Sequence, residues 1–157
     1  MAAIDIAGLI PHAGRMRLLE RVLEWDEAHI ALATASHRDP HNPLRSGGRL
    51  RAIHLCEYGA QAMAVHGGLV ARAGGNGIVG GLLVSLRDVR MHCAFVDGLP
   101  GELVVTGERL HDGGTSWQYA FRVTHEDALL ASGRAAVMEP ISQRLRPEPP
   151  PGGARRS

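Results

Sequence analysis

The chain has 157 residues, an apolar fraction of 45% and a formal net charge of +1 at pH 7. This length suits one domain with a full hydrophobic core, and the balanced charge excludes the basic field that indicates nucleic-acid binding. Apart from histidine, every basic residue is arginine, which excludes a lysine nucleophile or Schiff base from any mechanism.

The composition also predicts where the protein works. The first ten residues contain Asp5 and lack the basic start and long apolar run of a signal peptide. No stretch reaches the ~20 apolar residues that a membrane helix needs. Cys56 and Cys93 lie in apolar surroundings, which favours free thiols in a reducing compartment over a disulfide. We therefore expect a cytoplasmic protein without a membrane span.

The first part of the chain predicts short elements. Residues 4–16 predict a short helix followed by a loop. In the next segment, Ile30, Leu32 and Thr34 alternate with alanines, which favours a strand. Residues 37–48 are rich in Pro, Gly, Asn and Asp, and predict a loop.

Residues 49–72 form the clearest helix, because apolar residues recur there at spacings of three and four and glycines follow it. Its middle carries small residues such as Gly59, which let another layer of the structure approach closely. His54, Glu57 and Gln61 stand at i, i+3 and i+7, so they share one face, beside Tyr58.

The polar stripe formed by His54, Glu57 and Gln61 can be interpreted in two ways. It is either a solvent-facing stripe on a helix packed on one side, or it faces a substrate channel. We favour the channel, because the flanking residues are apolar or small and a helix wrapped by a sheet presents little surface to water.

The second half of the chain predicts an antiparallel sheet. Alternating patterns and tight turns predict strands within residues 78–93, 101–112, 115–125 and 126–139. One long central helix and many strands predict an α+β fold in which the curved sheet wraps around the helix. Residues 1–139 form this domain. The Pro-, Arg- and Gly-rich residues 140–157 cannot supply a core and are expected to be disordered.

Other motifs are weak. "GNGIVG" matches a dinucleotide-binding pattern but follows a helix and enters a strand, which is the reverse of the required context. His37 and His41 are spaced like metal ligands but lie in the loop with no third ligand at a recognised spacing.

Taken in order, several segments resemble the hotdog-fold 3-hydroxyacyl-(acyl carrier protein) dehydratases, and most of all their divergent branch associated with aryl polyene and related polyketide clusters. "LIPHAGRMRLLERVLEW" is similar to the family's opening Leu-Pro-His segment. "CEYGAQAMAVHGG" resembles its Glu-containing helix start, and "GGLLVSLRDVRMHCAFVDGLPGELVVTGE" resembles its strand, Arg-containing turn and Pro-Gly strand start. The resemblance covers most of residues 9–139.

The resemblance implies a dimer in which a helix Glu and a loop His from different subunits flank the substrate thioester. By position, Glu57 corresponds to the acid and Gln61 to the helix glutamine. The family's His-Phe-Pro-Gly loop is altered here to "HNPLRSGGRL", so His41 stands two residues farther from Glu57 than usual. His54 is the rival base. His12 is a third candidate, which we interpret as structural.

The implied reaction is dehydration of a 3-hydroxyacyl thioester on an acyl carrier protein or coenzyme A, which needs a base and an acid but no cofactor or metal. Backbone N–H groups near residues 50–54 could stabilise the thioester oxygen. Tyr58 and Gln61 are candidate substrate-binding residues, and Arg87 and Arg90 could meet the acidic groups of a carrier. Two alternatives stay open, namely a hotdog thioesterase and a half-catalytic subunit that works with a related chain, so the dimer is either a homodimer or a heterodimer.

Overall fold

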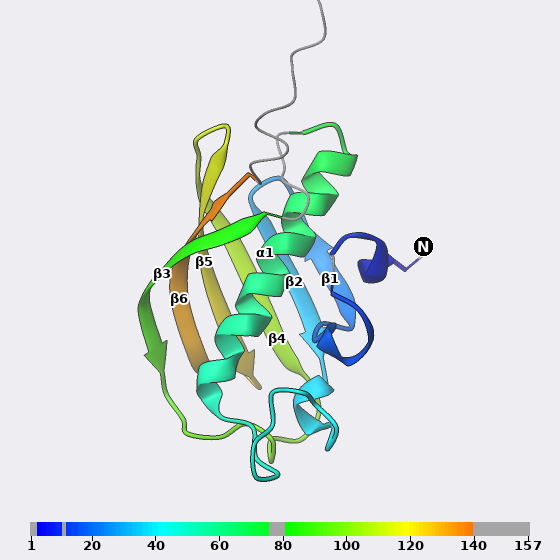
Figure 1. Ribbon diagram of the computed structural model, residues 1–157, viewed down its shortest axis with the longest axis vertical. Helices are drawn as coiled ribbons and strands as arrows, with labels where there is room; N and C mark the ends of the chain where they lie inside the picture. Colours follow the sequence, from blue (N-terminus) through cyan, green and yellow to red (C-terminus); the bar gives the residue numbers. More distant parts are fainter. Residues whose placement is uncertain (1–2, 11, 76–80, 140–157) are drawn as a thin grey trace, which may run out of the picture.

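The computed structural model, which describes residues 3–10, 12–75 and 81–139, contains one long helix packed on a six-stranded sheet (Figure 1). The strands are β1 (Arg21–Trp25), β2 (His29–Thr34), β3 (Leu82–Met91), β4 (Leu103–Asp112), β5 (Ser116–His125) and β6 (Ala128–Met138), and the helix is α1 (Leu55–Arg72). Short 3-10 turns occur at Ile6–Gly8, Gly14–Met16, Ser36–Arg38 and Ala52–His54.

The strand order is β1-β2-β4-β5-β6-β3, and every neighbouring pair is antiparallel. Figure 1 shows the sheet curving around α1, with β3 at one edge and β1 at the other. This confirms the predicted α+β hotdog arrangement. The domain boundary at residue 139 stays a prediction, because residues 140–157 and residues 76–80 of the glycine-rich segment lie outside the described residues.

Small residues set the distance between the helix and the sheet. A Cβ at Gly59 would lie 2.5 Å from Cγ of Phe121, a buried residue of β5. Trp117, Tyr119, Phe121 and Val123 alternate along β5 and all point into the core, as the period-two pattern predicts. The absence of a side chain at Gly59 therefore lets α1 lie close to β5, as the small residues in the helix sequence predicted.

The predicted start of the helix at residue 49 was wrong, because α1 begins at Leu55. The backbone of the preceding residues pairs instead with a segment forty residues away. Ala52 donates its N–H to the carbonyl of Ala94 (2.9 Å), and Val96 donates to the carbonyl of Leu50 (3.0 Å). Backbone groups that are already paired across the chain cannot also form helical hydrogen bonds.

The segment before β1 runs along α1 in the opposite direction. Near the end of the helix, the guanidinium of Arg72 donates to the carbonyl of Gly8 (2.9 Å). Farther back along the helix, the amide of Gln61 donates to the carbonyl of Met16 (2.5 Å). Residues between these two anchors are therefore held beside the middle of α1.

The edge strand β3 exposes several apolar side chains along its length. Leu82, Val84 and Leu86 keep 49%, 51% and 40% of their surface exposed. Among the described residues, β3 pairs with β6 on one side and leaves its other edge unpaired. An edge of this kind is a template for pairing with another chain.

Two further features concern the whole chain. Cys56 and Cys93 are free thiols, and burial raises the pKa of both. Over the described ranges, no helix combines the length and the apolar character needed to cross a membrane.

Candidate active site

A cavity of about 200 Å³ lies between α1 and the β3 side of the sheet. Its helix wall includes Glu57, Ala60, Gln61, Ala64 and Gly67, which recur every three or four residues on one face of α1. Ala60, Ala64 and Gly67 are small, so the space that larger side chains would fill remains open. Glu57 and Gln61, two of the three residues of the predicted polar stripe, lie on this wall.

The opposite wall is mainly apolar and aromatic. It includes Trp117 and Tyr119 of β5, Val137 of β6 and Leu83 of the edge strand β3. These strands are neighbours in the sheet, so the alternation of their side chains places these residues on the face that covers the helix. The cavity thus has an apolar interior suited to a hydrocarbon chain, with a few polar groups.

One of those polar groups, Tyr119, is tied to a buried histidine of α1. The Tyr119 hydroxyl donates to Nδ1 of His66 (2.7 Å), and Nε2 of His66 donates to the carbonyl of Asp26 (2.8 Å). A carbonyl can only accept, so Nε2 carries the proton and Nδ1 is left to accept. Burial raises the pKa of Tyr119 to about 12 and lowers the pKa of His66, so both groups are neutral near pH 7.

Glu57 lies at the surface end of the cavity, because its side chain both lines the cavity and is exposed to solvent. The expectation that a wrapped helix hides this face from water was wrong for the isolated chain, since the sheet covers only one side of α1 (Figure 1). Glu57 forms no salt bridge to any described residue. An exposed carboxylate at a cavity mouth has access to both substrate and solvent protons.

Gln61 and Tyr58 have structural hydrogen bonds that the sequence did not reveal. Gln61 is buried, and besides donating to Met16 it accepts from the backbone N–H of Leu18 (2.9 Å). The hydroxyl of Tyr58 lies 2.8 Å from Oγ of Ser36 and accepts from the amide of Asn42 (3.0 Å). The substrate-binding roles of Gln61 and Tyr58 stay predictions, and of the two only Gln61 lines the cavity.

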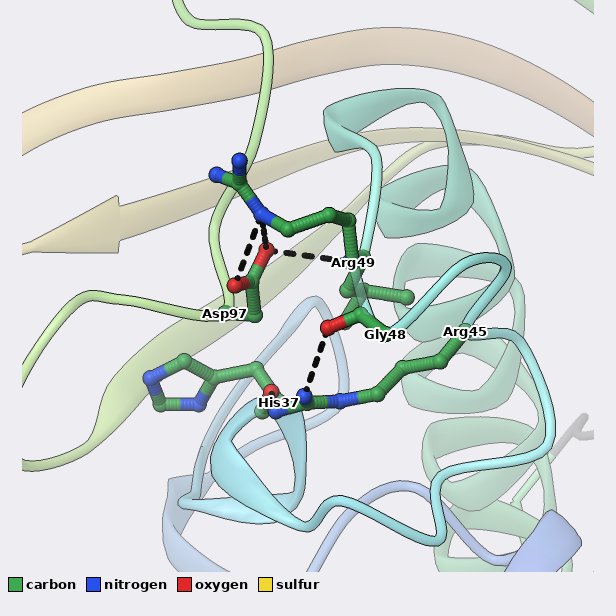
Figure 2. A network of polar contacts seen from close by, with 6 residues as sticks. His37, Arg45, Gly48, Arg49 and Asp97 are labelled. Carbon is green, nitrogen blue, oxygen red and sulfur yellow. Dashed lines mark hydrogen bonds and ion pairs between the residues drawn. The ribbon is translucent and has the colours of Figure 1, made fainter.

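The altered loop that carries His41 is held by polar contacts on both sides of the chain. The guanidinium of Arg45 donates to the carbonyls of His37 (3.0 Å) and Gly48 (3.1 Å), and Asp97 forms an ion pair with Arg49 (3.0 Å), as Figure 2 shows. His41 itself is exposed. The described residues contain no group of three or more His, Cys, Asp or Glu side chains that could hold a metal.

Neither of the two predicted histidine bases lines the cavity within one chain. His54 ends the 3-10 turn that precedes α1 and is partly exposed, while His41 lies in the loop. Arg90 is exposed on β3 and does not line the cavity either. The roles of these three residues stay predictions.

The expected backbone donors at residues 50–54 are largely occupied. Leu50 donates its N–H to Asp97 (3.0 Å), Ala52 donates to Ala94, and His54 donates to the carbonyl of Arg51 (3.1 Å). The prediction that these N–H groups face the thioester oxygen was therefore wrong for Leu50, Ala52 and His54. The loop at residues 94–97, which the sequence did not place here, uses the first two donors.

His12, which the sequence led us to interpret as structural, lines the cavity together with Glu57. Its Nδ1 is buried and has no hydrogen-bond partner among the described residues. In the sequence, only the resemblance of "LIPHAGRM" to the family's Leu-Pro-His segment pointed to His12. That resemblance identified the segment but did not show that it folds back onto the helix.

Comparisons with known proteins agree with this architecture. The chain is similar to a chain in the solved structure of the dehydratase heterocomplex ApeI:P from Xenorhabdus doucetiae, with a TM-score of 0.76 and 22% identity over 91% of this chain and 99% of that chain. It is also similar to the E. coli PaaI protein from the phenylacetic acid degradation operon, with a TM-score of 0.57 and 12% identity over 75% of this chain and 81% of that one.

A third solved structure, the zebrafish thioesterase superfamily member 2, has a TM-score of 0.59 and is 14% identical over 86% of this chain and 93% of that one. At these identities the similarity to solved structures shows the shared fold. No curated protein matches the chain. The ApeP-like family, described as ApeP dehydratase, matches residues 4–146, which is most of the sequence. The chain therefore belongs to the ApeP-like dehydratase family.

Proposed function

We propose that this dehydratase removes water from a 3-hydroxyacyl thioester carried on an acyl carrier protein, with Glu57 as one of its two proton-transfer groups. The observation that carries this proposal is the position of Glu57 at the mouth of an apolar cavity in a chain of the ApeP-like dehydratase family. The acyl chain would enter the cavity, and the thioester and the 3-hydroxyl would remain beside the carboxylate.

The chemistry requires two proton transfers. A base removes a proton from C2, the C2–C3 double bond forms, and the hydroxyl leaves C3 as water after receiving a proton from an acid. Each positioned group contributes roughly 100- to 10,000-fold to the rate. A carboxyl group and an imidazole can perform both transfers, so the reaction needs no cofactor.

The edge strand β3 supports a working unit of two subunits. Leu83 of β3 lines the cavity, and it is exposed to solvent like its neighbours Leu82 and Val84. A subunit paired along β3 would cover these apolar side chains and would extend a cavity that is smaller than the ~300–1,000 Å³ typical of ligand sites. The similar chain from Xenorhabdus doucetiae belongs to a heterocomplex, so we propose a related hotdog subunit as the partner.

The biological setting follows from the same relationships. We place the reaction in aryl polyene or related polyketide and fatty-acid synthesis, where successive 3-hydroxyacyl intermediates must lose water. The two free thiols fit a reducing compartment such as the cytoplasm.

The decisive variant is Glu57→Gln, which keeps the shape and polarity of the side chain but removes its titratable proton. We expect turnover of a 3-hydroxyacyl thioester to fall at least roughly 100-fold, measured as enoyl product by mass spectrometry. The melting temperature should stay unchanged, because Glu57 is exposed and forms no ion pair with a described residue. Full activity in Glu57→Gln would contradict the assigned role.

The thioesterase alternative is tested directly, because one of the structural neighbours above is a thioesterase superfamily member by name. Incubating the chain separately with 3-hydroxyacyl and saturated acyl thioesters distinguishes the reactions. A dehydratase releases water only from the first substrate, whereas a thioesterase releases free thiol from both. Thiol release without enoyl product would favour hydrolysis. Co-purification with a second hotdog protein would identify the partner-subunit arrangement.

A further inference from the structure

We propose that His12 is the second proton-transfer group of this site, so that one chain supplies both the imidazole and the carboxylate. The inference rests on the proposed function and completes it, because a dehydration site with Glu57 still needs a histidine. It also places the catalytic pair on one subunit, while a partner along β3 would complete the walls of the cavity.

The first observation is the position of the histidines. All nine lie in the described part of the chain, and His12 is the one that lines the cavity with Glu57. The loop histidine, His41, is exposed outside the cavity, and His54 stands before the first turn of α1. Within one chain, a substrate in the cavity therefore meets His12 and Glu57 from two different elements.

The second observation is the hydrogen bonding of the imidazoles. Histidines with a structural role in this protein bind backbone carbonyls: His37 binds that of Leu99 (2.9 Å), His66 that of Asp26 (2.8 Å) and His125 that of Pro100 (2.7 Å).

His12 does not follow that pattern. Its Nδ1 is buried without a hydrogen-bond partner among the described residues, as is Nδ1 of His37, but no described residue binds the ring of His12 as the carbonyl of Leu99 binds that of His37. Leaving a buried polar atom unpaired lowers the stability of the folded state. A histidine kept for structure alone would be expected to have a fixed partner, whereas one whose partner is the substrate would not.

The third observation is the way the segment is positioned. Gln61, one helical turn after Glu57, holds the chain that follows His12 by bonding the carbonyl of Met16 and the N–H of Leu18. Arg72 holds the chain that precedes His12 through the carbonyl of Gly8 (2.9 Å). The helix that carries Glu57 therefore also fixes both ends of the segment that carries His12.

The reaction balances with these two groups. Neutral His12 takes the C2 proton, the electron pair of the C2–H bond forms the C2–C3 double bond, and the C3–O bond breaks. The Glu57 carboxyl gives its proton to the departing hydroxyl, which leaves as water. Transfer of one proton from His12 to Glu57 through solvent restores the starting state, and no oxidant or reductant takes part.

The test uses the full chain, alone and with any hotdog subunit that co-purifies, assayed with a 3-hydroxyacyl thioester. We expect His12→Ala to lose at least roughly 100-fold in turnover. Added imidazole should restore part of this activity, which would not happen if His12 only supported the fold. His12→Ala combined with Glu57→Gln should be little slower than either variant alone, because the two residues act as a unit. His111→Ala is the matched control, because it removes an exposed imidazole of β4 that does not line the cavity. This variant should keep the turnover of the parent.

Each outcome has a distinct meaning. An active parent in which His12→Ala keeps full turnover would overturn the inference and leave the proposed function intact, and His41→Ala and His54→Ala would then identify the base. A parent that forms no enoyl product would contradict the proposed function itself. If His12→Ala melts at a lower temperature, His12→Gln provides a polar replacement; a folded His12→Gln that loses turnover would support the inference, because an amide cannot transfer the proton, and a folded His12→Gln with full turnover would overturn it.

Discussion

At the scale of single residues, Gly59 shows how the sequence sets the distance between α1 and the sheet. An added Cβ would lie 2.5 Å from Cγ and 2.6 Å from Cδ2 of Phe121, and one at Gly133 on β6 would lie 2.6 Å from Cε1 of the same ring. The two glycines therefore leave the space that the Phe121 ring occupies.

This contact yields a stability prediction. We expect Gly59→Ala to lower the free energy of unfolding by about 1–3 kcal/mol, because overpacking outweighs the gain in helix propensity. The measurement is urea unfolding followed by circular dichroism. Gly98→Ala is the control, since a Cβ there meets no atom within 4 Å. Equal stability of the two variants would show that α1 can shift away from the sheet without cost.

At the scale of elements, His66 connects three parts of the fold. It lies on α1, it accepts from Tyr119 on β5, and it donates to Asp26 in the turn between β1 and β2. Burial lowers the pKa of His66, so the folded state binds its proton less tightly than the unfolded state does. Its contribution to stability is therefore complete above the ordinary histidine pKa and is lost as the pH falls through the lowered value.

The predicted pH dependence follows from that sign. The melting temperature of the parent should fall from about pH 7.5 to about pH 5.5, and the fall should be smaller in His66→Gln. Part of the fall should remain, because burial also lowers the pKa of His37. His111→Gln, which changes an exposed histidine, should keep the parent's pH dependence. A fall of the same size in His66→Gln would contradict the prediction.

At the scale of the whole molecule, the exposed edge of β3 predicts assembly. We expect the chain to form a dimer, with itself or with a related hotdog subunit, at micromolar concentration. Val84→Arg should convert it to monomers, because a charge placed within a pairing edge must be buried without a partner. Analytical ultracentrifugation measures the change in mass.

The opposite edge of the sheet supplies the control for that experiment. Leu23 of β1 is 44% exposed, close to the 51% of Val84, so Leu23→Arg adds the same charge to an edge that we do not expect to pair. A monomeric parent, or a dimer that only Leu23→Arg dissociates, would show that β3 is not the interface.

The sequence determined the elements whose patterns are local. The alternation of Trp117, Tyr119 and Phe121 predicted β5 because side chains of a strand point to opposite faces in turn. One of the tight turns that the sequence predicted joins β5 to β6 at Glu126 and Asp127, and both residues adopt positive φ angles of 47° and 67°. The sequence also predicted an acid on the central helix, and the structure places Glu57 at a cavity.

Only the tertiary structure decided the features that depend on distant segments. The start of α1 is set by pairing with residues 94–97, so helical periodicity alone placed it six residues early. The exposure of Glu57 depends on how much of the helix the sheet covers. His12 reaches the cavity because Gln61 and Arg72 hold its segment against α1. These contacts join residues more than forty positions apart, and spacing along the sequence carries no record of them.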